Sequence, residues 1–337
     1  MTVKIGLVDT GFISEYHFNG FSSDPRCEIV GVARTWRKDA DLDQQRQKLE
    51  KFAADHKIKA YDDFAAMVTS PDIDAVVVSS INPYHFEQIM SALEHGKHVL
   101  AEKPVVKTET ELSKLSAKAS EAGLCLMPAH NFAYRGAVLE AKQLLETGKL
   151  GKIQYGSFTQ SFFCNAVVGG QWRCDHASAW GGVLMDSGTH LVYQTLQLIG
   201  KPVKVQAFTA RNVFEMDDED IASLQLQYAD GTIVHLMQNW GSQHGEDIEG
   251  IKIVGSEGRI KISDALYFNG EKINPDTDYA DSFKNQASAF VSFILDGKTP
   301  ESNLDDAIWT LRIINAAYLS AKSDRVVNIG AEQNCES

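Results

Sequence analysis

The sequence is poor in cysteine and has no long apolar run. Its five cysteines are scattered and never spaced as C-x-x-C; they are Cys27, Cys125, Cys164, Cys174 and Cys335. This odd, dispersed set argues against a disulfide framework and a structural zinc knuckle, and it is typical of a reducing compartment. No apolar stretch reaches the length of a bilayer span. We therefore expect a cytoplasmic protein with no membrane segment.

Positive charge is also scarce, because 32 lysines and arginines face 45 aspartates and glutamates, for a net charge of −13. This balance argues against nucleic acid or an anionic membrane as the main partner. A small anionic ligand stays compatible with it, since a local cluster of positive groups can outweigh the global field. The N-terminus enters a strand-like run at once, so we expect no secretory signal.

At 337 residues the chain suits two domains, and its 44% apolar and 23% charged residues are an ordinary globular balance. Up to residue 128, short β-branched runs alternate with longer amphipathic segments. The expected strands are Lys4–Val8, Glu28–Ala33, Lys57–Tyr61, Ala75–Ser79, His98–Ala101 and Leu124–Met127. The expected helices are Phe12–Ser22, Asp41–His56, Tyr84–His95 and Thr108–Ala122. This alternation predicts an α/β domain over residues 1–128, built on a doubly wound parallel sheet.

From residue 129 to residue 337 the pattern changes to strands in series. They are Lys152–Phe163, Val203–Phe214, Ile221–Tyr228, Thr232–Trp240, Glu249–Val254 and Arg259–Ser263, with a hairpin signal at Asp230-Gly231. The expected helices are Tyr134–Thr147, Gly188–Ile199, Ser282–Leu295 and Leu304–Ala321. We expect a second, α+β domain with a mostly antiparallel sheet.

A dinucleotide-binding turn is expected after the first strand, where glycines let a pyrophosphate approach the N–H groups of a helix N-terminus. The sequence there reads Gly6-Leu-Val-Asp9-Thr10-Gly11-Phe12-Ile13-Ser14. Gly11 holds the middle glycine position, Ser14 is small enough for the last, and Asp9 replaces the first. A carboxylate there could repel the pyrophosphate or cap the following helix. We expect Asp9, Thr10, Gly11, Phe12 and Ile13 to line a cofactor site; the alternative is a turn with ordinary glycines.

Val8-Asp-Thr-Gly11 also matches the aspartic-protease signature. That chemistry needs two carboxylates sharing a proton in a β-rich fold. The nearest second element, Asp186-Ser-Gly188, is followed by a helical pattern. We therefore reject the protease interpretation.

The end of the second strand indicates the form of the cofactor. An acidic residue about 20 positions after the glycine turn normally binds the ribose 2′-hydroxyl, whereas arginine accommodates a 2′-phosphate. The chain has Arg34, Thr35 and Arg37 there, with no carboxylate before Asp39. Because planar guanidinium matches phosphate and can stack on adenine, we favour NADP(H), with NAD(H) as the second possibility. The alternative is a solvated basic loop.

A set of motifs follows in order along the chain: Ser79 to His85, Glu102-Lys103-Pro104, Asn131 to Arg135, Gly148 to Gly151, Trp172-Arg173, and Gly181 to His190. Together they resemble the Gfo/Idh/MocA family (glucose-fructose oxidoreductase, inositol dehydrogenase and relatives) over nearly the whole chain. The resemblance implies a Rossmann domain, a C-terminal domain with an open antiparallel sheet often used to form homo-oligomers (a dimer or a tetramer), and an active site between them. The sequence departs from the family at Asp9, and at Tyr193, where many relatives carry an acid.

Further cofactor contacts follow from these motifs. We expect Ser79, Asn82, His85, Glu102, Lys103 and Asn131 to line the cofactor groove. Trp172 and Arg173 would lie across the cofactor or the substrate, unless they form a buried tryptophan with a paired arginine. His244 would face the pocket or sit in a polar turn.

Interconverting an alcohol and a ketone needs a hydride acceptor and a group that moves the hydroxyl proton. His190 suits the second task because its ordinary pKa lies near neutrality. Asp186 lies four residues earlier, so on a helix the two side chains share a face. The resemblance assigns Lys103, Asp186 and His190 to the catalytic centre and implies a polyhydroxylated substrate such as a sugar or cyclitol. The plainer alternatives are a surface ion pair and a rim lysine.

Two other functions are compatible with parts of the sequence. Asp186 and His190 also have metal-ligand spacing, with Cys174 and His176 upstream, but a zinc site would need further ligands, so we expect no metal. A non-catalytic dinucleotide sensor on the same fold is suggested by the altered glycine turn. The presence of Lys103, Asp186 and His190 argues against it. We expect an enzyme, an NAD(P)-dependent dehydrogenase or reductase that acts on CH–OH groups.

Overall fold

The computed structural model describes residues 2–330 apart from 38–40, 169–170, 244–247 and 274–278. Close contacts divide the chain into two compact units. The first unit holds Met1–Tyr134 and Tyr279–Leu304, and the second holds Arg135–Asp278 and Asp305–Ser337. None of the described helices combines the length and the apolarity that a membrane span requires.

The first unit is built on a six-stranded parallel sheet in the order β3-β2-β1-β4-β5-β6. The strands are β1 (Val3–Val8), β2 (Cys27–Ala33), β3 (Lys59–Ala60), β4 (Ala75–Val78), β5 (His98–Ala101) and β6 (Leu126–Pro128). The strand order reverses between β1 and β4, which is where ligands bind in open α/β sheets, beyond the carboxyl ends of the strands. The predicted doubly wound domain is confirmed.

Helices of this unit follow the expected pattern. They are α1 (Phe12–Ser22), α2 (Leu42–His56), α3 (Phe64–Val68), α4 (His85–Glu94), α5 (Glu109–Ala122) and α9 (Tyr279–Asp296), with short 3-10 turns at η1 (Asn82–Tyr84) and η2 (Asn131–Tyr134). Helix α5 shows why its bounds were readable. Thr108 and Glu111 form a capping box at its start, and Gly123 closes it at φ 64°. Helix α3 was not predicted, because five residues are too few to show a period.

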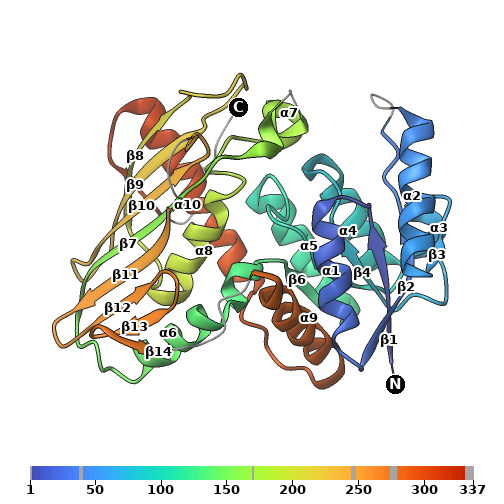
Figure 1. Cartoon of the computed structure of the whole chain (residues 1–337), viewed down its shortest axis with the longest axis horizontal. Helices are drawn as coiled ribbons and strands as arrows, with labels where there is room; N and C mark the ends of the chain where they lie inside the picture. Colours follow the sequence, from blue (N-terminus) through green and yellow to red (C-terminus); the bar gives the residue numbers. More distant parts are fainter. Residues whose placement is uncertain (1, 38–40, 169–170, 244–247, 274–278, 331–337) are drawn as a thin grey trace. The chain divides into compact units, whose positions relative to one another are not determined.

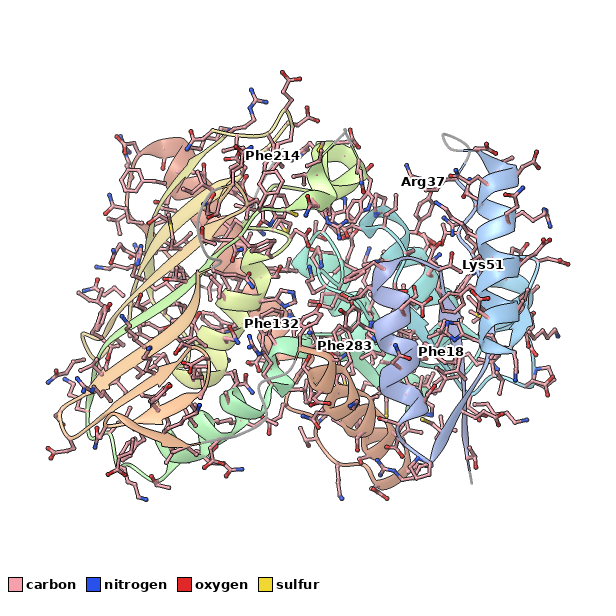
Figure 2. The ribbon with its side chains drawn as sticks, viewed as in Figure 1. Phe18, Arg37, Lys51, Phe132, Phe214 and Phe283 are labelled. Carbon is pink, nitrogen blue, oxygen red and sulfur yellow. The ribbon has the colours of Figure 1, made fainter. Side chains whose placement is uncertain are left out.

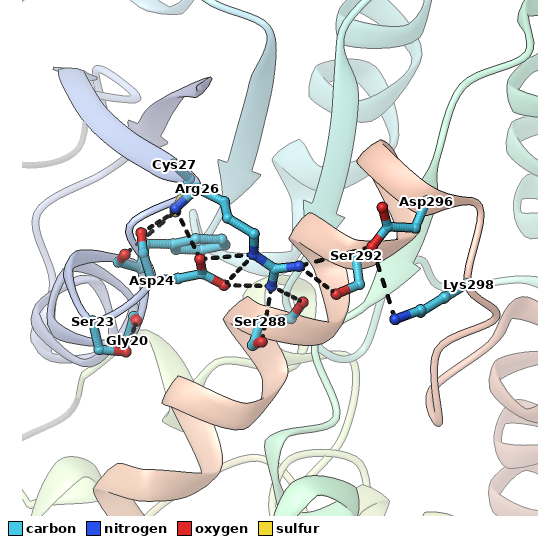
Figure 3. Close-up of polar contacts among 10 residues, drawn as sticks. Gly20, Ser23, Asp24, Arg26, Cys27, Ser288, Ser292, Asp296 and Lys298 are labelled. Carbon is cyan, nitrogen blue, oxygen red and sulfur yellow. Dashed lines mark hydrogen bonds and ion pairs between the residues drawn. The ribbon is translucent and has the colours of Figure 1, made fainter. Parts of the chain in front are cut away.

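Helix α9 packs beside α1 in the first unit (Figure 1), although the sequence places it far downstream. A Cβ at Gly20 would lie 2.7 Å from the carbonyl oxygen of Phe283, so only glycine lets α1 approach α9 this closely. Arg26 adds polar contacts (Figure 3): its guanidinium donates to Asp24 at 2.6 Å and to the Ser292 hydroxyl at 2.9 Å. This grouping differs from the boundary predicted at 128/129, which placed the helix in the second domain.

The second unit contains a nine-stranded sheet in the order β14-β13-β12-β11-β7-β10-β9-β8-β15. Its strands are β7 (Ile153–Ser161), β8 (Lys204–Ala210), β9 (Ile221–Gln227), β10 (Ile233–Asn239), β11 (Ile248–Gly255), β12 (Arg259–Ile262), β13 (Leu266–Phe268), β14 (Glu271–Ile273) and β15 (Val327–Asn328). Strands β7 and β10 are parallel and the other neighbours antiparallel. The predicted fold class, including the hairpin at Asp230-Gly231, is confirmed. The last three strands were not predicted, because each has two or three residues.

Helices α6 (Gly136–Glu146), α8 (Gly188–Leu198) and α10 (Leu304–Ser323) cover one face of this sheet, and α7 (His176–Ala179) is a single turn (Figure 1). Alternate residues of β9 and β10, such as Leu224 and Leu236, join Ile313 and Ile314 of α10 in one core. The opposite alternation carries exposed apolar side chains: Phe208 is 60%, Ile233 48% and Tyr155 44% exposed. This period-2 pattern is that of a sheet with one covered face.

Candidate active site

The turn after β1 places Asp9 beside the end of β2. The Asp9 N–H donates to Ala33 at 2.8 Å, and Asp9 has φ 76°, a left-handed conformation. Glycine normally takes this position of the fingerprint because it has no Cβ; aspartate is among the few other residues that adopt it with any frequency. The turn therefore keeps the glycine-type backbone while presenting a carboxylate.

The Asp9 carboxylate faces the residues that follow β2. Its Oδ1 lies 3.8 Å from Nε of Arg34, and it accepts hydrogen bonds from the backbone and the side chain of Thr35. Burial raises the pKa of Asp9, while Arg34, Thr35 and Arg37 counteract that rise. Arg34 also donates through Nη1 to the hydroxyl of Thr10. Asp9 does not cap α1, because the N-cap of that helix is Gly11 and no side chain caps it.

The start of α1 fits a pyrophosphate. The first N–H groups of the helix have no side-chain cap, and a Cβ at Gly11 would meet nothing within 4 Å. Ser14, fully buried, takes the place of the last glycine: its hydroxyl lies 3.2 Å from that of Ser79, which donates to Val8 at 2.6 Å. Nε of Arg34 is buried without a hydrogen bond. These uncapped donors are what a dinucleotide phosphate would satisfy. Phe12 at this turn is 73% exposed, and Ile13 is half-buried.

His85 and Asn131, both predicted to line the cofactor groove, are buried and bonded to the protein. The ring of His85 lies 2.9 Å from the carbonyl oxygens of both Ser80 and Pro104, and burial lowers its pKa. The amide of Asn131 donates to the Ser282 hydroxyl of α9 at 3.0 Å. These bonds brace the segments around Lys103 and η2. Asn82, in η1, is also buried. Cofactor contacts by these residues stay a prediction.

Lys103 follows β5 at the carboxyl edge of the parallel sheet. The preceding carboxylate, Glu102, is buried; its Oε2 accepts the Lys103 N–H at 3.1 Å, and its Oε1 lies 2.9 Å from Nε2 of His17 on α1. His130, just after β6, is buried too. Burial and the Lys103 charge lower the pKa of His130 to about 3, so its ring is neutral at physiological pH. Sequence reasoning missed His17 and His130, which no motif or spacing connects to Lys103.

In the second unit, Asp186 pairs with Arg173. Nε of Arg173 donates to Oδ2 of Asp186 at 2.7 Å, and the guanidinium carbon lies 4.4 Å from the centre of the Trp172 ring. Trp172 is half-buried, so the tryptophan–arginine pair is formed but is not a buried core pair. Asp186 stands just before α8 and His190 lies in its first turn, buried. The sequence analysis expected Asp186 and His190 to share one face of a helix. In the structure only His190 lies in the helix, because Asp186 precedes its first residue.

Glu219 positions the segment that carries Asp186. Its Oε1 accepts hydrogen bonds from the Leu184 N–H and the Tyr318 hydroxyl, both at 3.0 Å. A Cβ at Gly182 would lie 1.9 Å from the Glu219 carbonyl oxygen, which explains the glycine there. Tyr193, which departs from the family pattern, is buried and donates to Asp306 of α10 at 3.3 Å. Sequence reasoning missed Glu219, and His244 lies outside the described residues.

Comparison with known proteins agrees with this arrangement. Residues 3–130 match the family model of an oxidoreductase family with an NAD-binding Rossmann fold, and residues 138–261 match that of the GFO/IDH/MocA C-terminal domain. The chain belongs to the Gfo/Idh/MocA family of oxidoreductases. The predicted resemblance is thereby confirmed.

Relatives in this family include dehydrogenases with diverse substrates. An uncharacterized oxidoreductase of Schizosaccharomyces pombe is 30% identical over 67% of this chain and 60% of its own length. The scyllo-inositol 2-dehydrogenase (NADP(+)) of Bacillus subtilis is 24% identical over 97% of this chain and 96% of its own. A levoglucosan dehydrogenase, solved with NADH and levoglucosan, superposes with a TM-score of 0.86 at 19% identity, covering 98% of this chain and all of that one. At that identity the likeness shows the fold.

Proposed function

We propose that this protein is an NAD(P)-dependent dehydrogenase or reductase that exchanges a hydride with a hydroxyl or carbonyl carbon of a sugar, cyclitol or related polyol. The observation that carries the proposal lies within the first unit. The uncapped turn at Gly11 and the lysine at the end of β5 lie at the same carboxyl edge of one parallel sheet. The names of the inositol and levoglucosan relatives support the substrate class.

For the cofactor, we propose a preference for NADP(H), with NAD(H) as the second possibility. Arg34 and Thr35 come directly after β2, and the positive charge of Arg37 also acts on Asp9 beside them. The relatives include an enzyme named for NADP(+) and one solved with NADH, so the family allows both. Fluorescence titration of the purified protein tests this. NADPH should bind more tightly than NADH, and the reverse order would remove the assignment.

For proton transfer, we propose that Lys103, Asp186 and His190 act on one substrate. A bound nicotinamide supplies or accepts the hydride. The Lys103 ammonium donates a hydrogen bond to the reacting oxygen, and the imidazole of His190 takes the hydroxyl proton during oxidation. Asp186, held by Arg173, accepts a hydrogen bond from the substrate or from His190.

A panel of sugars and cyclitols, followed at the absorbance of the reduced nicotinamide, tests the reaction. With a substrate found, His190→Ala and Lys103→Ala should each lower kcat by about 10²–10⁴-fold, and dinucleotide affinity should change little in His190→Ala. Lys97→Ala is the matched lysine control, since Lys97 donates to the Ser70 and Ile73 carbonyls at the opposite end of β5. Tight dinucleotide binding with no turnover on any compound would favour the alternative of a sensor.

We also propose a homo-oligomer, a dimer or a tetramer. The exposed apolar side chains Phe208, Ile233 and Tyr155 lie on β8, β10 and β7, three of the four consecutive strands β7-β10-β9-β8 of the second unit. Such a surface is typical of a contact between subunits. Light scattering after size exclusion should give a multiple of the 37.2 kDa chain mass, and Phe208→Asp should reduce it. A monomeric wild type would contradict this proposal.

A further inference from the structure

The carboxylate that the end of β2 lacks is present at the end of β1. Strands β1 and β2 are parallel neighbours, and Val8 pairs with Ala33 in their register. Asp9 and Arg34 are therefore the next residues on adjacent strands. The carboxylate of Asp9 accepts hydrogen bonds from Thr35 and lies 3.8 Å from Nε of Arg34. Both side chains are largely shielded, each with 16% of its surface exposed.

This pairing changes what Arg34 can offer a ligand. A guanidinium attracts a phosphate most strongly when no other anion is near it. Here a fixed carboxylate already balances its charge in a partly dehydrated corner. The same carboxylate is a good acceptor for a ribose hydroxyl, the role that an acid at the end of β2 fills in NAD-binding folds. The ends of β1 and β2 thus hold a group for each cofactor: Arg34 for the 2′-phosphate of NADP(H) and Asp9 for the ribose hydroxyl of NAD(H). The two groups are coupled because they form an ion pair with each other.

We propose that Asp9 decides between the two cofactors by acting as the counter-ion of Arg34. Ionised Asp9 offers an acceptor to the free ribose hydroxyls of NAD(H) and so reduces the preference for NADP(H), whereas protonated Asp9 leaves Arg34 available to the 2′-phosphate of NADP(H). The inference rests on the proposed function in requiring a dinucleotide at this edge of the sheet. Its consequence is that the preference for NADP(H) increases as the pH falls.

The surroundings of Asp9 support a proton-linked choice. Burial raises the pKa of Asp9, which moves its protonation toward the working pH range, and the charges of Arg34 and Arg37 act against that rise. On α1, the acid of the first turn is Glu15, whose carboxylate pairs with His56 at 3.0 Å. At the end of β4 the neighbouring side chain is the uncharged Ser79. Among the described residues, Arg34 and Arg37 thus make the main contributions of charge at Asp9.

Isothermal titration of the full chain with ADP-ribose and with 2′-phospho-ADP-ribose tests the proposal without any turnover. At pH 8, Asp9→Asn should improve the affinity ratio in favour of the phosphorylated ligand by about tenfold, because a charge is lost at nearly constant shape. When the pH is lowered from 8 to 6, the affinity ratio in favour of 2′-phospho-ADP-ribose should rise more in the wild type than in Asp9→Asn. Because Asp9→Asn has no carboxylate at position 9, its own pH dependence measures the protonation of the 2′-phosphate of the ligand, whose second pKa is about 6.

Further variants keep the result interpretable. Asp9→Gly removes the charge and also suits the left-handed backbone, so it should reproduce the effect of Asn if either variant folds poorly. In an Arg34→Gln background, Asp9→Asn should leave the ratio unchanged, because its effect passes through Arg34. Asp72→Asn, at an exposed acid that pairs with Lys4, is the control and should change nothing.

The failures are distinguishable. If both ligands bind the wild type and Asp9→Asn leaves their ratio unchanged at pH 8, this inference is wrong and the proposed function stands. An equal effect of Asp9→Asn with and without Arg34 would also overturn it. If neither ligand binds the wild type, the dinucleotide site itself is refuted, and the inference with it.

Discussion

His17 and Glu102 are joined by a buried contact, with Nε2 of the histidine 2.9 Å from Oε1 of the carboxylate. The other oxygen of Glu102 accepts the N–H of Lys103. The ring of Phe283, labelled in Figure 2, packs edge-to-face against the His17 ring, with 5.2 Å between the two ring centroids. Helix α1, which follows the proposed phosphate-binding turn, is thereby connected to the segment of the proposed catalytic lysine.

His17→Ala should therefore affect both catalysis and stability. Leaving the buried Glu102 oxygen without its partner costs about 1–3 kcal/mol of unfolding free energy. We also expect kcat to fall about tenfold while dinucleotide affinity changes less, because the Lys103 backbone loses its fixed position. His17→Gln, which keeps a donor, should recover part of kcat. Urea unfolding and steady-state kinetics measure the two effects. An unchanged kcat in a stable His17→Ala protein would show that the contact is structural alone.

Arg26→Ala should weaken the packing of α9 on the first unit. The guanidinium donates to Asp24 and to the hydroxyls of Ser288 and Ser292 (Figure 3). Its side chain is 36% exposed, so we expect a loss of about 1–2 kcal/mol rather than the full value of a buried pair. Lys51→Ala is the matched control, since its ion pair with Asp55 on α2 is exposed to solvent and should contribute less to stability. Equal losses would contradict this ranking.

The same pair gives a pH dependence. Hydrogen bonds from Arg26 lower the pKa of Asp24, so the folded state binds this proton less tightly than the unfolded state. The stabilisation is fully present above the ordinary aspartate pKa and is lost as the pH falls through the lowered one. Wild-type unfolding free energy should decrease in acid more than that of Asp24→Asn. Parallel curves for the two proteins would rule out this contribution.

Glu219 should behave in the opposite sense. Burial raises its pKa, while its bonds to Leu184 and Tyr318 only partly oppose the rise. The folded state therefore binds this proton more tightly, and stability falls as the pH rises from the ordinary glutamate pKa through the raised one. Glu219→Gln should flatten this decline, and Glu219→Ala should cost about 1–3 kcal/mol through the unpaired donors. Thermal unfolding across pH compares the three proteins, and a decline retained in Glu219→Gln would refute the assignment.

Arg173→Lys should impair catalysis although the charge is kept. The guanidinium donates to Asp186 while lying over the Trp172 ring, and lysine cannot reproduce that planar geometry. We expect kcat/KM to fall about tenfold, with Arg173→Ala somewhat worse. Arg312→Lys, at an arginine that faces Trp309 on α10, is the control for a change of the same kind. A full effect from Arg173→Ala with none from Arg173→Lys would mean that charge alone matters.

Much of the fold was predictable because the signals were local. The apolar run at β4, the capping box of α5 and the glycine at its end each act within a few residues. Short elements such as α3 and β14 gave too few residues for a period. Local signals could not predict that α9 belongs to the first unit, because its packing there depends on the close approach of Gly20 to Phe283.

The candidate site divides in the same way. Lys103, Asp186 and His190 were proposed from motifs contiguous in sequence, and their catalytic roles stay a prediction. The contacts between residues distant in sequence were not predicted: Glu102 meets His17 across 85 positions, and Asp9 meets Arg34 across 25. Such contacts are created by strand order, which brings distant residues to one edge. The sequence of the turn suggested that Asp9 either repels the pyrophosphate or caps the following helix. Neither alternative includes its ion pair with Arg34, which directly follows the neighbouring strand.

The path of the chain has a consequence for any attempt to separate its halves. The polypeptide leaves the first unit after Tyr134, returns to it at Tyr279, and leaves again after Leu304. A fragment that stops at residue 134 would expose the surface of α1 that Phe283 and Phe290 cover, so it should aggregate or stay partly unfolded. Supplying Tyr279–Leu304 in trans, or fusing it through a linker, should restore cooperative unfolding. The first unit is therefore encoded in two pieces, and a truncation between residues 134 and 279 would remove one of them although the whole parallel sheet is retained.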